Sequence, residues 1–246
     1  MITPTPSGHS SIWHRQKGNP TVHSGSFSVS SQRFNTDGLA VSTRDHDGRF
    51  GWAVTDGVID SHISQCIAYV TAHAAAETAA HDSVLKGVQA AREENIAHEA
   101  GDACLIVGRF DSSHGGWSIA WVGHCRAYGV IDDQLVQLTN DHALPRATYP
   151  SNDLRAEFPA HDLKGLKLMP TASILRHHRP ATAHISLQCR LIILTDGIHT
   201  TLTYHQIADT VLTTPDPDDC ARLLVTRAAQ AWQRPDSGTA LVINPT

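Results

Sequence analysis

The order of strand-like and helix-like segments along the 246-residue chain is the feature that most constrains its fold. Apolar and polar residues alternate, as in half-buried strands, over Ser26–Gln32, Gly38–Ser42 and Arg49–Thr55. In the last of these segments, Phe50, Trp52 and Val54 fall on one face. We therefore expect the chain to open with an antiparallel sheet.

Helical spacing follows in two Ala-rich segments, Ser61–Ala80 and Asp82–Glu99. We expect Ile63, Ile67 and Val70 on one side of the first helix. Asp82 is placed to cap the second helix.

The second half of the chain repeats this order. Strand patterns return over Ala103–Phe110, Trp117–Val122, Arg126–Ile131 and Gln134–Leu138, and later over Ala183–Leu187, Arg190–Thr195 and Thr239–Ile243. The pairs Gly115-Gly116 and Asp132-Asp133 predict the hairpin turns of a meander. Helices are expected over Thr203–Leu212, capped by Thr203, and over Asp216–Trp232, with Asp216 as cap and Pro217 at the first helical position.

This order of elements predicts an α+β fold. The expected architecture is a four-layer αββα sandwich, in which two antiparallel sheets form the centre and helices cover their outer faces. A parallel α/β sheet is disfavoured because consecutive strands lack helical crossovers.

The composition and net charge of the chain exclude several classes of protein. Hydrophobic residues make up 41% and charged residues 17% of the chain, which argues against disorder. The net charge is −5 without a long basic run, so we expect no nucleic-acid partner. There is no apolar run of membrane-spanning length and no signal-peptide core, so we expect a cytoplasmic protein without a membrane partner. The five cysteines are scattered singly and are expected to be mostly reduced core residues.

Residues 1–23 are rich in Ser, Pro, Thr and Gly, which predicts a flexible leader ahead of one domain spanning 24–246.

Three aspartates stand at turns that adjoin an apolar strand: Asp56, Asp196 and Asp236. Gly57 and Gly197 follow the first two directly, and such a glycine lets the backbone turn so that its carbonyl can approach a cation. Carboxylates held at the mouth of a rigid sheet suit hard cations such as Mg²⁺ and Mn²⁺. Taken singly, each of these segments is also explained as a plain turn.

Read in order, six segments resemble the signature series of type 2C (PPM-type) metal-dependent protein serine/threonine phosphatases. They are Asn35-Thr36-Asp37, Val54–Gly57, Trp121–Tyr128, Gln137–His142, Leu191–Gly197 and Asp236–Thr239. The resemblance covers nearly everything from Gly25 to Asn244.

The resemblance implies a role for each matching residue. Asp56 would bridge two Mn²⁺ or Mg²⁺ ions, with the Gly57 carbonyl on the first ion. Asp196 and Asp236 would complete the coordination of the second ion. Asp37 would hold a metal-bound water without binding an ion itself. The reaction implied is attack of a metal-activated water on phosphorus, without a covalent phosphoenzyme.

Some positions depart from the family pattern. Thr36 replaces a glutamate that orients water at the first ion. His124 replaces the aspartate of a weaker third ion, where an imidazole suits Mn²⁺ better than Mg²⁺. Gln32 stands where the phosphate-binding arginine is expected, and Arg33 takes that role only if a bulge corrects the register.

Other histidines are weaker candidates. His142 fits a structural role and a catalytic role equally well, and His177-His178 are expected to be solvated loop residues rather than site residues. The segment of about 144–180 corresponds to the family's flap beside the active site, where substrate preference is expected to reside.

The function expected from the resemblance is hydrolysis of phosphoserine and phosphothreonine in proteins, as a signalling enzyme that opposes a kinase. The expected partner is therefore a phosphorylated protein, either a kinase or its target, and the chain is expected to be a monomer. Two alternatives stay open: a pseudophosphatase that serves as a regulatory or binding module, and a phosphohydrolase of small molecules.

Overall fold

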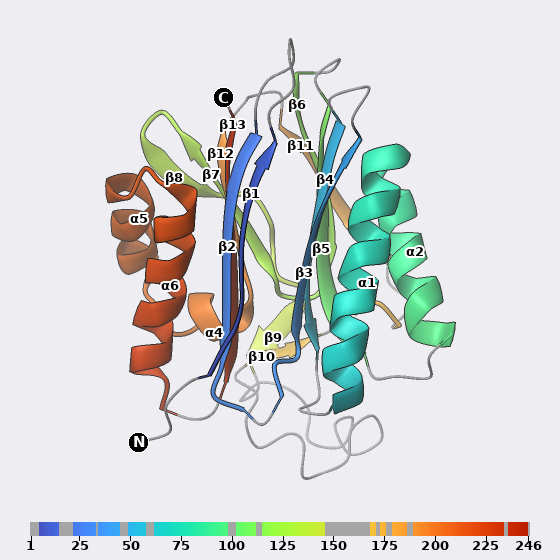
Figure 1. Cartoon of the computed structure of the whole chain (residues 1–246), viewed down its shortest axis with the longest axis horizontal. Coiled ribbons are helices and arrows are strands. Elements are labelled where there is room, and N and C mark those ends of the chain that lie inside the picture. Colours follow the sequence, from blue (N-terminus) through green and yellow to red (C-terminus); the bar gives the residue numbers. More distant parts are fainter. Residues whose placement is uncertain are drawn as a thin grey trace.

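The computed structural model describes residues 5–14, 22–32, 34–44, 49–57, 62–97, 102–111, 115–145, 168–170, 173–175, 179–185, 189–233 and 236–245. Two large antiparallel sheets face each other, and helices cover their outer faces (Figure 1). The expected α+β sandwich is confirmed. All strand pairs among the described residues are antiparallel.

One sheet has six strands and the other has five. The six-stranded sheet contains, in spatial order, β1 (Thr5–His14), β2 (Val22–Ser30), β13 (Ser237–Pro245), β12 (Arg190–Leu194), β7 (Arg126–Ile131) and β8 (Gln134–Gln137). The five-stranded sheet contains β11 (Ala181–Ile185), β6 (Gly116–Val122), β5 (Ala103–Asp111), β4 (Arg49–Gly57) and β3 (Asp37–Arg44). A separate pair is formed by β9 (Ala143–Pro145) and β10 (Leu168–Pro170).

Sheet membership corrects two predictions. The expected opening sheet is divided, because β2 lies in the six-stranded sheet whereas β3 and β4 pair in the five-stranded one. The expected meander is also divided, since β5 and β6 belong to one sheet and β7 and β8 to the other. The chain crosses between the sheets at 123–125, where Gly123 has a φ of 100° that favours glycine. The hairpin turn at Asp132-Asp133 is confirmed, and both residues have positive φ as a type I′ turn requires. At the other predicted turn, β5 and β6 pair as a hairpin, but Gly116 is already the first residue of β6 and pairs with Asp111.

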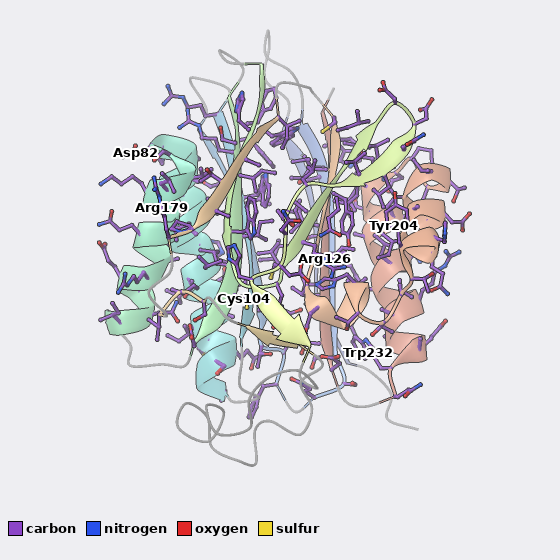
Figure 2. All side chains as sticks on the ribbon, turned by 180° about the vertical axis from the view of Figure 1, so that it is seen from behind. Asp82, Cys104, Arg126, Arg179, Tyr204 and Trp232 are labelled. Atoms are coloured by element: carbon purple, nitrogen blue, oxygen red, sulfur yellow. The ribbon has the colours of Figure 1, made fainter. Side chains whose placement is uncertain are left out.

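The central core lies between the two sheets, whose side chains fill the space between them (Figure 2). Phe50, Trp52 and Val54 all point into it, as the alternation predicts. Leu191 and Ile193 reach the same core from the opposite sheet. A site formed where strands of both sheets end therefore has a rigid support.

The five-stranded sheet is covered by α1 (His62–His81) and α2 (Val84–Ala97) (Figure 1). The buried face of α1 consists mainly of alanines, and the close approach leaves no room for a side chain at Gly38 or Gly51, where a Cβ would collide with backbone atoms of α1. Ile67 is buried, whereas Val70, which was expected on the same side of the helix, is 37% exposed. The side chain of Ile63 lies outside the described residues.

Helix caps are confirmed at two of three positions. Thr203 and Gln206 form a capping box at the start of α5 (Tyr204–Thr213), and Asp216 caps α6 (Pro217–Ala231). Both helices pack on the six-stranded sheet. At α2 the prediction was wrong by one residue, because Ser83 Oγ, rather than Asp82, accepts the hydrogen bond from the Lys86 amide.

The start of the chain differs from the expectation. Thr5–His14 forms β1, which pairs with β2 at the edge of the six-stranded sheet, although its sequence lacks an apolar alternation. Backbone hydrogen bonds to a preformed strand do not require such an alternation. The domain boundary at 23/24 stays a prediction. Most of the flap-like segment at 144–180 lies outside the described residues.

Four of the five cysteines, Cys104, Cys125, Cys189 and Cys220, are buried, all five are free, and Cys66 is exposed. Within the described residues, no helix is long and apolar enough to cross a membrane.

Candidate metal centre

Asp56 and Asp37 face each other at one end of the five-stranded sheet. They are direct partners in the register of β3 and β4. The turn beyond Asp56 is fixed because the Gly57 amide donates to the Thr36 carbonyl at 3.0 Å. The strand ends therefore present two carboxylates side by side.

Asp196 comes from the other sheet, at the point where β12 ends and the short helix α4 (Asp196–His199) begins. Gly197 allows the start of β13 to approach closely, since a Cβ there would collide with the Ser237 carbonyl oxygen and would lie 3.5 Å from the Asp236 carboxyl carbon. Asp236 is held in turn by the residue that follows β2, because the Ser31 amide donates to its carbonyl at 2.9 Å. The turns of β12 and β13 thus place Asp196 near Asp236.

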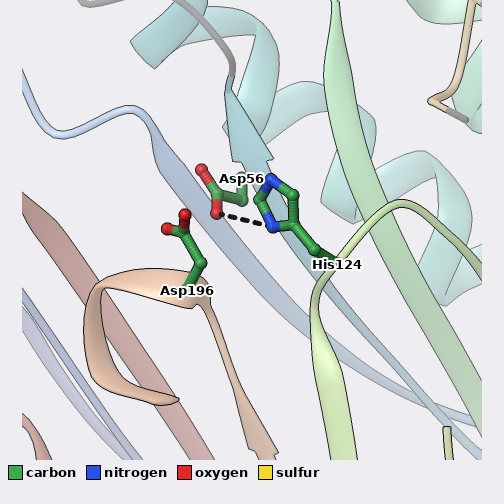
Figure 3. A group of neighbouring side chains, drawn as sticks. All are labelled: Asp56, His124 and Asp196. Carbon is green, nitrogen blue, oxygen red and sulfur yellow. Dashed lines mark ion pairs between the residues drawn. The ribbon is translucent and has the colours of Figure 1, made fainter. Parts of the chain in front are cut away.

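His124 completes a three-residue cluster. It lies in the connection between β6 and β7 and is 4% exposed. One ligand atom from each of Asp56, His124 and Asp196 lies within 4.8 Å of the others. Figure 3 shows the three side chains pointing toward one another from separate elements.

Thr195 joins Asp37 to the second sheet. Its hydroxyl donates to Asp37 Oδ2 at 2.9 Å and accepts from the Thr239 amide at 2.9 Å. The Thr239 hydroxyl also hydrogen-bonds to Asp37. One oxygen of Asp37 is therefore fixed by two threonines of the opposite sheet.

Burial and mutual repulsion disfavour charge on these carboxylates. Burial raises the pKa of Asp37 to about 7, the hydrogen bonds from Thr239 and Thr195 oppose the rise, and the charge of Asp196 adds to it. Burial also raises the pKa of Asp56 well above its ordinary value, and the charges of Asp196, Asp37 and Asp236 raise it further.

The donor set fits a divalent cation. Asp37 Oδ1, Asp56 Oδ2 and His124 Nδ1 are buried and have no hydrogen-bond partner. Buried polar atoms are normally satisfied, and a cation between the carboxylates would both satisfy them and offset their repulsion. Carboxylate oxygens with one imidazole nitrogen suit Mn²⁺ well.

The structure thus brings together most of the candidate residues. Asp56, His124 and Asp196 form one cluster, Asp37 adjoins Asp56, and Asp236 lies close enough to raise the pKa of Asp56. Their roles as ligands stay predictions.

The remaining candidates are not part of the three-residue cluster or are outside the described residues. Arg33 and His177-His178 are outside the described residues. His142 stacks on Trp121 with ring centroids 6.1 Å apart, and Gln32 accepts from the Ser237 hydroxyl at 3.5 Å.

Sequence reasoning missed Thr195, Thr239 and His199. Thr195 directly precedes Asp196, and a polar residue at the end of an apolar strand was the available signal. His199 donates from Nε2 to the His124 carbonyl at 2.8 Å, and burial lowers the pKa of His199 to about 4. Nothing in the local sequence around His199 indicates that contact.

The paired sheets and outer helices form the fold of PPM-type Ser/Thr phosphatases, and solved structures confirm this resemblance at the level of fold. The PPM Ser-Thr phosphatase MsPP from Mycobacterium smegmatis, solved with cacodylate, is 22% identical with a TM-score of 0.67, covering 89% of this chain and 97% of its own. The catalytic domain of serine threonine protein phosphatase PstP, solved with two manganese ions, is 18% identical with a TM-score of 0.59, covering 92% and 100%. RsbX, solved with magnesium, is 10% identical with a TM-score of 0.65, covering 96% and 100%. The sequence matches no protein-family model, and no curated protein matches it.

Proposed function

We propose that this chain is a metal-dependent phosphatase that hydrolyses phosphoserine and phosphothreonine in proteins. The observation that carries the proposal is the cluster of Asp56, His124 and Asp196, whose ligand atoms lie within 4.8 Å in a PPM-type fold. The PstP domain with manganese and RsbX with magnesium support Mn²⁺ or Mg²⁺ as the cation.

The proposed ligands are Asp56, the Gly57 carbonyl, Asp196 and Asp236, which would hold two ions, with His124 at the position of a weaker third. When bound, such ions supply an acidified water and offset negative charge on the phosphoryl oxygens. Because Asp56 and Asp196 come from opposite sheets, the fold itself fixes their separation.

Asp37 is proposed to orient water rather than to bind the ions directly. Its Oδ2 is held by Thr195, whereas its Oδ1 is buried and unpaired. With ions bound, this unpaired carboxylate oxygen would accept a hydrogen bond from a water beside them and would thereby orient that water. The position of Asp37 relative to the proposed ions is fixed because Thr195 of the opposite sheet holds its carboxylate.

Substrate recognition is proposed to use Arg33 for the phosphate and the segment of about 144–180 for the surrounding protein. The partner is then a phosphorylated protein, either a kinase or its target.

A regulatory module without turnover is the second candidate, and Thr36 is the observation in its favour. Thr36 is 3% exposed and stands where the resemblance calls for a carboxylate that orients water. One solved relative in fold is described as a key regulatory component, PppA of Pseudomonas aeruginosa, at 20% identity and a TM-score of 0.63, covering 92% of this chain and 98% of its own.

Hydrolysis of phosphothreonine peptides and of an aryl phosphate, with and without Mn²⁺, tests the proposal. We expect metal-dependent turnover that Asp196→Asn removes. Asp133→Asn is the matched control, because it makes the same chemical change in an exposed hairpin turn. Mn²⁺ binding without turnover would support the regulatory module, and turnover of the aryl phosphate alone would favour a small-molecule substrate.

A further inference from the structure

We infer that His199 is a positioning residue, which holds the backbone of His124 so that its imidazole stays in register with Asp56 and Asp196. The inference rests on the proposed function, since it concerns the same metal centre. His199 itself touches neither the proposed ions nor the substrate.

The contact has a defined direction. His199 is 6% exposed, and its Nε2 lies 2.8 Å from the carbonyl oxygen of His124. A carbonyl oxygen only accepts, so Nε2 carries the hydrogen and Nδ1 carries a lone pair. The ring is therefore neutral, because a second proton would leave a buried donor on Nδ1 without a partner.

This hydrogen bond joins two of the backbone segments that carry proposed ligands, the one with Asp196 and the one with His124. His199 belongs to α4, which begins at Asp196 and follows a strand of the six-stranded sheet. His124 lies where the chain leaves the five-stranded sheet, directly after Gly123 with its positive φ. Residues 123–125 lie outside the strand ladders. The His142 amide holds the Gly123 carbonyl there, and the imidazole of His199 holds the carbonyl of His124 itself.

The free-energy cost of burying the imidazole of His199 also supports a positioning role. Its Nδ1 is buried without a hydrogen-bond partner, and an unpaired buried nitrogen destabilises a fold. An apolar residue would fill the same space without that penalty. Packing alone therefore does not account for a histidine here, whereas a need for the Nε2 donor does.

Two substitutions distinguish the loss of the Nε2–H donor of His199 from a change in side-chain packing. In His199→Gln, the side-chain amide can place an N–H near the position of Nε2, whereas His199→Leu keeps apolar bulk and removes the donor. We expect His199→Leu to weaken Mn²⁺ binding by about tenfold, the size of effect seen when a group supporting a metal ligand is lost, and His199→Gln to stay within about threefold of the parent. Isothermal titration calorimetry with Mn²⁺ measures both.

Leu202→Val is the control for general loosening. Leu202 is buried in the cluster behind α4, so this change reduces packing without touching the His199 contact. Mn²⁺ affinity in Leu202→Val is expected to equal that of the parent. Equal losses in Leu202→Val and His199→Leu would overturn the inference, as would unchanged affinity in His199→Leu.

A second readout does not depend on metal. Long-range ¹H–¹⁵N correlation spectra of the metal-free protein should show His199 as the Nε2–H tautomer, and the opposite tautomer would overturn the inference. If the parent protein binds no Mn²⁺, the proposed metal centre fails and this inference fails with it. Mn²⁺ binding by the parent with no effect of His199→Leu overturns the inference alone.

Discussion

His124 Nδ1 lies 3.8 Å from Asp56 Oδ2, and both atoms are buried. This separation is too long for a hydrogen bond. It agrees with two ligands of a single ion, because atoms that each lie about 2.1 Å from one cation are about 3–4 Å apart. The spacing therefore favours shared coordination over a direct His–Asp contact, and it leads to the predictions that follow.

Asp56→Asn should abolish Mn²⁺ binding and reduce turnover at least about a hundredfold, because it removes the charge proposed to bridge two ions. The metal-free variant should nevertheless be more stable than the parent, by about 1 kcal/mol, since burial and three neighbouring carboxylates disfavour the Asp56 charge. Calorimetry and urea unfolding measure the two effects. A variant that retains Mn²⁺ affinity would show that Asp56 is not a ligand.

Thr36→Glu should raise Mn²⁺ affinity about threefold to tenfold by restoring the carboxylate that the resemblance places beside the first ion. Thr36 Cβ lies close to Gly57, as a Cβ built there would be 3.2 Å from it, so a longer side chain starts next to the proposed carbonyl ligand. Thr36→Gln is the matched control, because it has the same size without charge. Equal affinities in the two variants would mean that added charge at this position does not reach the ion.

The stability of the metal-free protein should fall as pH rises from about 4 to about 7. Burial raises the pKa of Asp37 to about 7, whereas an unfolded aspartate has a pKa of about 3.9. Between these values the folded state keeps a proton that the unfolded state has released, so stability decreases with rising pH. The share due to Asp37 is on the order of 2 kcal/mol, discounted for its partial exposure.

Urea unfolding at pH 5 and pH 8 checks this share by comparing the parent with Asp37→Asn. The variant should lose part of the pH dependence, and saturating Mn²⁺ should stabilise the parent most at pH 8, because the cation binds the charged carboxylates. Identical pH dependence in both proteins would contradict the raised pKa of Asp37.

Local patterns predicted the layers of the fold because periodicity and capping depend on neighbouring residues. The alternation at Phe50, Trp52 and Val54 and the cap at Thr203 are of this kind. Sheet membership was not predictable, because it depends on which distant strand supplies the hydrogen bonds. The chain crosses between the sheets at Gly123, which has a positive φ. A glycine permits this conformation, but its presence in the sequence does not predict it.

In the candidate site, too, features set by the local sequence were predicted and features set by distant contacts were not. Asp56 and Asp196 were found because each ends an apolar strand at a turn. Thr195 and His199 were missed because their partners, Asp37 and His124, are 158 and 75 residues away in the chain. The polar residue at the end of β12 marks Thr195 as a position of interest, but its contact with Asp37 follows from the packing of the two sheets.

His124→Asp should shift metal preference without destroying the centre. The proposed core ions depend on Asp56, Asp196 and Asp236, whereas His124 contributes a nitrogen that suits Mn²⁺ and is a poor ligand for Mg²⁺. We expect the ratio of Mn²⁺-supported to Mg²⁺-supported turnover to fall about tenfold in the variant. Since protons compete with a metal for an imidazole nitrogen, the loss of Mn²⁺ affinity toward acid pH should also be less steep.

The matched control for this change is His184→Asp, which makes the same substitution on the exposed strand β11. It should leave the metal ratio and the pH profile as in the parent. His124 is buried at a strand end, so its alternative role is packing alone, with no contact to an ion. Metal titrations distinguish the two roles: a packing residue would lose stability on substitution by aspartate while the Mn²⁺/Mg²⁺ ratio stayed constant, whereas a ligand would change the ratio even where stability is preserved.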